Sequence, residues 1–238
     1  LPSIPRVVWL HGHDVLWSWE VNARSGWEAA EKRVALIPRQ IVQRPALRRF
    51  LDESDRVVCV SMWLRDACKR QDAVVIHNPI DAERFSPSAD PWPGDYAGVT
   101  VKQLNNRHGG VDIAVDAFRE ELMPRLMVLG KGRLAESLWR RARGAHVWFR
   151  HEHVPNEQLP SVFHGAMFYV APSRFETQGV AMCEAMACGL PVVGFATGGI
   201  PEFVTEKEGI LVHKRDAWSL ADAVMSLCHD RRRFLRMA

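Results

Sequence analysis

The sequence predicts an α/β fold in which a smaller α/β domain precedes a doubly wound, Rossmann-like domain built on a parallel sheet. Three observations support this. Short apolar runs without strict alternation recur along the 238 residues, which is typical of buried parallel strands. Segments of helical composition separate these runs. Apolar residues make up 47% of the chain and charged residues 25%, an ordinary globular composition.

In the first part of the chain, apolar runs predict strands over 6–10, 56–60 and 73–77. Ser61 follows the second run and is a suitable N-cap for a helix over 63–70. Three strands are too few for a complete doubly wound domain, so we expect a partial or reduced amino-terminal domain.

Segment 86–98 separates the two parts, because its three prolines and two glycines are typical of a linker. We therefore predict domains over 1–90 and 91–238. Six further strands, alternating with helical segments, are predicted over 98–101, 126–129, 145–149, 167–170, 191–193 and 209–212.

The most informative segment is 172–204, PSRFETQGVAMCEAMACGLPVVGFATGGIPEFV. It begins where an apolar, strand-like run ends, and its helical part starts at Gly179. Glu176 is therefore expected on the loop after a strand, and Glu184 in the second turn of the following helix. Between them, the free N–H groups of Gly179 and Val180 form a natural anion site.

This order of carboxylate, anion cradle and second carboxylate suits a ligand made of sugar, phosphate and ribose. The alternative is that Glu176 and Glu184 are surface charges near a helix start, where acidic residues are favoured. The glycine-rich sequences that follow make the first interpretation stronger.

The segment resembles the signature of retaining GT-B glycosyltransferases of family four, also called glycosyl transferases group 1. The shared features are a PSxxE loop, two glutamates separated by seven residues, EAMAxGxPVV and GGxPE. Weaker similarity spans about 56–230. The resemblance implies a GT-B fold and a metal-independent, retaining hexosyltransferase of carbohydrate biosynthesis. Its donor would be a UDP-, GDP- or ADP-sugar, its acceptor a hydroxyl group of a sugar, lipid or small molecule, and it would need no cofactor.

The resemblance also implies roles for individual residues. Glu176 would face the hydroxyl groups of the donor sugar at the catalytic centre, and Glu184 would hold the ribose. Thr177, Gln178, Gly179 and Val180 would surround the diphosphate.

A buried diphosphate needs cations as well as amides. Lys102 fits the first of the two cationic positions that the resemblance implies. The second position falls on Gly109, which leaves Arg107 or His108 to reach the phosphates and is a departure from the family pattern. Alternatively, Lys102 and Arg107 are solvated loop charges.

Four histidines are candidate site residues. His11 and His13 follow the first predicted strand, where the resemblance implies a histidine near the reacting sugar, and both are candidates for that contact. The sequence does not choose between them, and a structural role is the alternative. His151 and His153 have a spacing that metal sites use, but without a third ligand nearby they predict no metal site.

The net charge of +3 gives no indication of nucleic-acid binding. Seven basic residues within 22–50 are compatible with peripheral contact with an anionic inner membrane face. However, prolines interrupt the segment, and an ordinary solvated helical face is the favoured interpretation. Five cysteines without CxxC spacing favour a reducing, cytoplasmic location.

Two features of the chain depart from a complete member of the family. The first half is shorter than the amino-terminal domain of the family, and the chain begins at Leu1 rather than Met. We expect a fragment of a longer enzyme, inactive in isolation, rather than a reduced relative. The alternatives are a non-catalytic nucleotide-sugar-binding domain, a degenerate relative of the family or, less in keeping with the motifs, a sugar-nucleotide epimerase.

Overall fold

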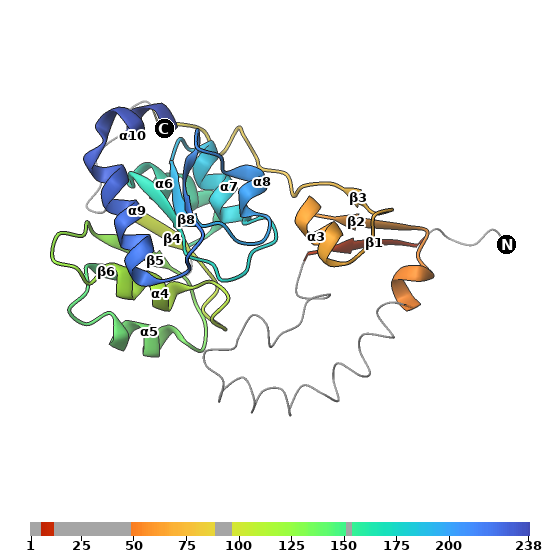
Figure 1. The fold of residues 1–238 in the computed structure, drawn as a ribbon, viewed down its shortest axis with the longest axis horizontal. Helices are drawn as coiled ribbons and strands as arrows, with labels where there is room; N and C mark the ends of the chain where they lie inside the picture. The colour runs from red at the N-terminus through yellow and green to blue at the C-terminus, as the bar shows by residue number, and fades with distance from the viewer. Residues whose placement is uncertain (1–5, 12–48, 89–96, 151–153) are drawn as a thin grey trace. The chain divides into compact units, whose positions relative to one another are not determined.

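Two parallel sheets organise the part of the chain that the computed structural model describes, namely residues 6–11, 49–88, 97–150 and 154–238 (Figure 1). The chain divides into the units Leu1–Asn78 and Pro79–Ala238. The predicted range 91–238 lies inside the second unit, and most of the predicted linker lies outside the described residues.

The first unit contains a three-stranded sheet of β1 (Val7–Leu10), β2 (Arg56–Cys59) and β3 (Val74–Val75), in that order. Helix α3 (Met62–Ala67) follows β2. As predicted, Ser61 caps this helix: its hydroxyl oxygen accepts a hydrogen bond from the Leu64 amide at 3.2 Å.

The second unit contains a six-stranded parallel sheet in the order β6-β5-β4-β7-β8-β9. All six predicted strands are present, three of them with slightly shifted bounds. The strands are β4 (Gly98–Val101), β5 (Leu126–Leu129), β6 (Val147–Arg150), β7 (Phe168–Ala171), β8 (Val192–Phe195) and β9 (Gly209–Val212). The chain runs outward from β4 through β5 to β6, then returns to the other side of β4 with β7. The switch point of the sheet therefore lies between β4 and β7, where α/β proteins commonly bind ligands.

Helices cover both faces of this sheet. They are α4 (Val111–Ala117), α5 (Ala135–Arg141), α6 (Leu159–His164) with a 3₁₀ turn before it (η1, Asn156–Gln158), α7 (Val180–Ala187), α8 (Ile200–Phe203), α9 (Ala217–His229) and α10 (Arg231–Met237). Because successive side chains of a strand point to opposite faces, Leu126 and Val128 pack in one core with α4, α5 and α9, whereas Met127 and Leu129 pack in another with α6 and α7. The doubly wound architecture is thus confirmed.

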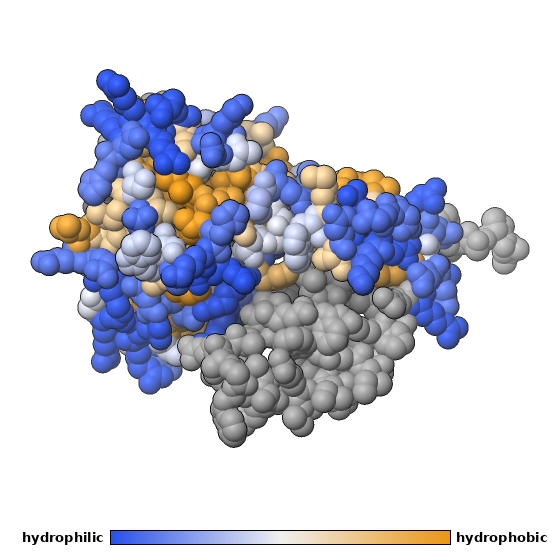
Figure 2. All heavy atoms as spheres, viewed as in Figure 1, coloured by the Kyte–Doolittle hydropathy of each residue, from blue (hydrophilic) through white to orange (hydrophobic). Residues whose placement is uncertain are grey.

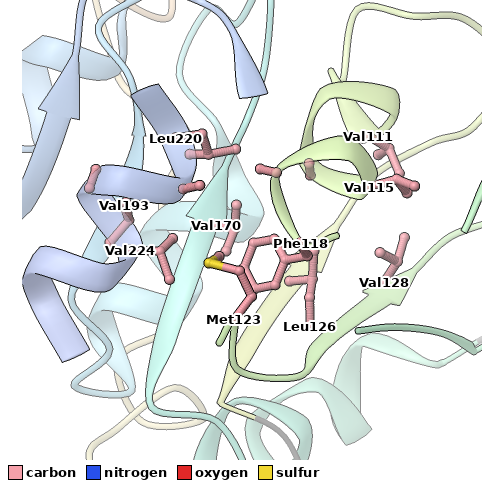
Figure 3. Packing of buried hydrophobic residues seen from close by; sticks show 14 of the residues in the cluster. Val111, Val115, Phe118, Met123, Leu126, Val128, Val170, Val193, Leu220 and Val224 are labelled. Atoms are coloured by element: carbon pink, nitrogen blue, oxygen red, sulfur yellow. The ribbon is translucent and has the colours of Figure 1, made fainter. Parts of the chain in front are cut away.

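The first of these cores is shown in Figure 3, where Phe118 lies close to Met123 and Leu126 at the end of α4. Leu220 and Val224 of α9 belong to the same core. These side chains are almost fully buried, so this part of the molecule holds the strand ends in fixed positions.

Hydrophilic residues cover much of the described surface in Figure 2, with an apolar area in the upper part of the second unit. Among the described residues, none of the helices is both long and apolar enough to cross a membrane.

Candidate functional site

A cavity of about 730 Å³ opens at the carboxyl ends of β4 and β5, beside the loop that follows β7. It therefore lies at the switch point of the sheet. Its lining consists of strand-end and loop residues together with the start of α7: Val101, Lys102, Gln103, Asn105, Leu129, Gly130, Lys131, Val154, Leu159, Glu176, Gly179, Val180 and Ala181.

Lys102 and Glu176 form an ion pair in this cavity. The Lys102 Nζ donates to the Glu176 Oε2 at 2.8 Å, and the two side chains are only 10% and 24% exposed. Burial pulls the pKa of Lys102 down, but the charges of Glu176 and Tyr169 outweigh it and raise this pKa to about 12. Burial pushes the pKa of Glu176 up, but Lys102 more than offsets this and holds it below the usual glutamate value. Both groups are charged at neutral pH.

The start of α7 borders the same cavity. Gly179 is its N-cap with φ at +80° and has no side chain with which to cap the helix. Gly179 and Val180 line the cavity, so the first amides of α7 are available to an anion there. Thr177 and Gln178 lead into the helix and are buried, and the Thr177 amide donates to the Glu176 Oε1 at 3.3 Å. The predicted loop, helix start and first carboxylate are thus brought together.

Glu184 lies in the second turn of α7, as predicted, but its contacts differ from those of Glu176. Its Oε1 accepts a hydrogen bond from the Asn156 Nδ2 at 3.0 Å, and Asn156 in turn accepts one from Arg84 at 2.8 Å. Burial raises the pKa of Glu184, since the side chain is largely shielded from water. Glu184 is not part of the lining described above, so this cavity contains only the first of the two glutamates.

Arg107 does not line the cavity. Its guanidinium lies 3.8 Å from the Asp112 carboxylate, which is paired more closely with Arg174. The structure therefore places Arg107 in a charge network beside α4, whereas Lys102 reaches the cavity.

The two histidine candidates belong to the first unit. His11 directly follows β1 and is exposed, and its ring stacks on Trp9 with ring centres 6.1 Å apart. His13 lies outside the described residues, as do His151, His153 and all but the last two residues of the basic segment 22–50.

Sequence reasoning missed Lys131, which lines the cavity from the loop after β5. The sequence feature that could have identified it is a lysine between two glycines, directly after a predicted strand. Gly130 is needed there because a Cβ would lie 1.9 Å from the Lys102 carbonyl oxygen. The loops after β4 and β5 thus pack backbone against backbone and bring two lysines to one cavity.

Within the described part of the chain, no group of three or more His, Cys, Asp or Glu side chains is placed to hold a metal ion. A second cavity, of about 440 Å³, opens at the opposite edge of the sheet beside α10. It is lined mostly by apolar side chains and lacks the paired charges of the first.

Residues 97–230 match the protein family described as glycosyl transferases group 1. The chain is also 30% identical, over an alignment 257 residues long, to a GDP-mannose-dependent alpha-(1-6)-phosphatidylinositol monomannoside mannosyltransferase of Mycolicibacterium smegmatis. That alignment covers 95% of this chain and 62% of the relative.

Among solved structures, the fold is similar to sucrose-phosphate synthase from Thermosynechococcus elongatus, with a TM-score of 0.76 and 23% identity over 97% of this chain and 62% of that one. It is also similar to Anabaena HepE in complex with UDP and glucose, with a TM-score of 0.70 and 19% identity over 98% of this chain and 64% of that one. These likenesses confirm the expected GT-B class of fold. The chain spans about three fifths of the length of these relatives.

Proposed function

This chain belongs to the glycosyl transferases group 1 family, and we propose that it forms the donor-binding part of a retaining hexosyltransferase. The reaction moves a sugar from a nucleotide diphosphate to a hydroxyl acceptor. One observation carries the proposal: the Lys102–Glu176 pair and the start of α7 border one cavity at the switch point of the sheet.

Each part of that cavity suits one part of the donor. The diphosphate gains negative charge as the sugar leaves, and Lys102, Lys131 and the first amides of α7 are fixed groups that stabilise this charge. These groups supply the positive partners of the diphosphate, so we propose a reaction that uses no metal ion. Glu176 accepts hydrogen bonds from sugar hydroxyls and thereby orients the reacting carbon.

Glu184 and Asn156 extend the site toward the nucleoside. A carboxylate at this position is a suitable acceptor for the two hydroxyl groups of a ribose. The named relatives indicate which bases to test, because one is called GDP-mannose-dependent and another was solved with UDP. We propose a UDP- or GDP-sugar as the donor, with an ADP-sugar as the third candidate.

A relative and the cysteines indicate the acceptor and the location. The mannosyltransferase relative is named for a phosphatidylinositol acceptor, which supports a lipid-linked or sugar hydroxyl as the acceptor and contact with the inner face of a membrane. All five cysteines are free thiols, in keeping with the cytoplasm.

The first test is calorimetric titration of the purified chain with UDP, GDP and ADP, in the absence of metal and with magnesium. We expect one nucleoside diphosphate to bind, without dependence on magnesium. Failure of all three to bind would contradict the assignment of the site.

The second test measures sugar transfer and donor hydrolysis by the full-length product of the gene, with UDP-, GDP- and ADP-hexoses. The anomeric configuration of the product, determined by NMR, tests retention. We expect Glu184→Ala to weaken donor binding and Glu176→Ala mainly to slow transfer. Binding without turnover would instead support a non-catalytic nucleotide-sugar-binding domain, and normal turnover in both variants would refute the residue assignment.

A further inference from the structure

Arg174 lies two residues before Glu176, in the loop that follows β7, but its side chain turns to another part of the unit. Its NH1 and NH2 groups donate to the two carboxylate oxygens of Asp112 at 2.6 and 2.9 Å. NH1 also donates to the Arg107 carbonyl at 3.0 Å. The Arg174 and Asp112 side chains are only 24% and 10% exposed, so this is a largely buried, bidentate ion pair.

The backbone of Arg174 is held as well. Its amide donates to the His108 carbonyl at 2.8 Å, on the loop that leads into α4. Its carbonyl accepts hydrogen bonds from the Thr197 hydroxyl and the Arg215 NH1, both at 3.1 Å. The loop is therefore tied on one side to the start of α4 and on the other to residues that follow β8 and β9.

Two facts connect this arrangement to the donor cavity. Arg174 itself does not line the cavity, and its charge is matched by Asp112, so it is not placed to bind phosphate. However, the loop that it anchors carries Glu176 and leads into the start of α7. A shift of that loop would move Glu176 and the start of α7 relative to Lys102, which directly follows β4.

We propose that Arg174 and Asp112 are positioning residues that fix the Glu176 loop for sugar transfer. This inference rests on the function proposed above. A misplacement of about 1 Å at reacting groups can slow a reaction about 100-fold. Loss of the Arg174 clamp should therefore reduce transfer more than it reduces nucleotide binding. The Lys102 backbone stays tied to β5, because its amide donates to the Leu129 carbonyl at 2.9 Å, and Glu184 stays bonded to Asn156.

A second aspartate of α4 provides a matched control. Arg141 also pairs with both carboxylate oxygens of an α4 aspartate, Asp116, but this pair is more exposed and lies away from the cavity. Arg174→Met and Arg141→Met each remove an arginine that forms two hydrogen bonds with an aspartate of α4. Arg174→Lys keeps the positive charge but cannot form the bidentate pair with Asp112.

The experiment measures kcat and KM for the donor and Kd for the nucleoside diphosphate, in the full-length protein. We expect Arg174→Met to lower kcat about 100-fold and to change Kd by less than about threefold, a difference under about 0.7 kcal/mol. Arg174→Lys should recover part of kcat, and Arg141→Met should change neither constant. If Arg174→Met keeps the wild-type kcat, or if kcat falls and Kd rises together in both methionine variants, the proposal is wrong.

Two further measurements separate this inference from the proposed function. Amide hydrogen exchange over 174–181 should rise in Arg174→Met and stay unchanged in Arg141→Met, and this readout needs no substrate. If the wild type transfers no sugar, the proposed function fails, while unchanged exchange in Arg174→Met refutes the positioning role independently. Should Arg174→Met not fold, Arg174→Lys carries the same comparison.

Discussion

Lys102 and Glu176 are 74 positions apart in sequence, yet the ammonium of one lies 2.8 Å from the carboxylate of the other. They meet because β4 and β7 are neighbours in the sheet, so the loops at their carboxyl ends share one edge. Each charge makes burial of the other tolerable. The pair therefore presents a cation and a carboxylate side by side. In the proposed function, the cation binds the phosphates of the donor and the carboxylate binds its sugar.

The first prediction concerns Lys102→Met. This change removes a cation from the cavity and leaves Glu176 without its charged partner, so the pKa of Glu176 should rise. We expect the affinity for the nucleoside diphosphate to fall about 10- to 100-fold, which corresponds to the loss of one charge-assisted contact. Calorimetric titration at two salt concentrations measures this.

The matched control is Lys214→Met, which removes an exposed lysine paired with Asp216 outside the cavity. This variant should bind as the wild type does. If Lys102→Met also binds as the wild type does, Lys102 is not a phosphate ligand.

The second prediction is a pH dependence from Glu184. Burial raises the pKa of this carboxyl group above the usual 4.5, and only the ionised form accepts hydrogen bonds from both ribose hydroxyls. Affinity for the nucleoside diphosphate should therefore be fully developed above the raised pKa, and should begin to fall at a higher pH than an ordinary glutamate would cause.

Glu184→Gln supplies the comparison, because the phosphate of the ligand also titrates, with a pKa of about 6. That titration is common to both proteins, so the ratio of their Kd values isolates Glu184. We expect the variant to bind more weakly at neutral pH and the ratio to approach one as the pH falls. A ratio that does not change with pH would contradict the role of the ionised carboxylate.

These residues also show how far the sequence could predict the site. Hydrophobic periodicity and glycine punctuation placed Glu176 on a loop and Glu184 in the second turn of α7, and both placements are confirmed. The same patterns could not identify their partners. Asn156 reaches Glu184 from η1, and Lys131 reaches the cavity from the loop after β5, because the strand order decides which loops meet.

The limits of the fold prediction have a similar cause. A strand was expected over 73–77, yet only Val74–Val75 pairs with its neighbour. Beyond it the Ile76 amide still donates to the Cys59 carbonyl at 3.0 Å, but at the next residue the His77 ring nitrogen Nδ1, and not the backbone, forms the hydrogen bond with the Val60 carbonyl at 2.8 Å. Apolar composition indicates a strand, but the tertiary contacts determine its length.

The last prediction tests the backbone support of the Glu176 loop through Gly198. This glycine has φ at +58°, and a Cβ added there would lie 1.8 Å from the Glu176 carbonyl oxygen. The next residue, Gly199, donates its amide to that same oxygen at 3.1 Å. Gly198→Ala must therefore displace the loop as well as strain its own backbone, so we expect a loss of about 3 kcal/mol or more in unfolding free energy and a large fall in transfer.

Gly144 is the control for the strain alone. It has φ at +74°, but a Cβ there would meet no described atom within 4 Å. Gly144→Ala should cost only about 1–2 kcal/mol, as expected for a side chain in the left-handed region, and should leave transfer unchanged. Urea denaturation of both variants, together with their transfer rates, separates steric displacement from backbone strain. Equal losses of stability and activity in the two variants would show that the contact between Gly198 and the Glu176 carbonyl does not position the loop.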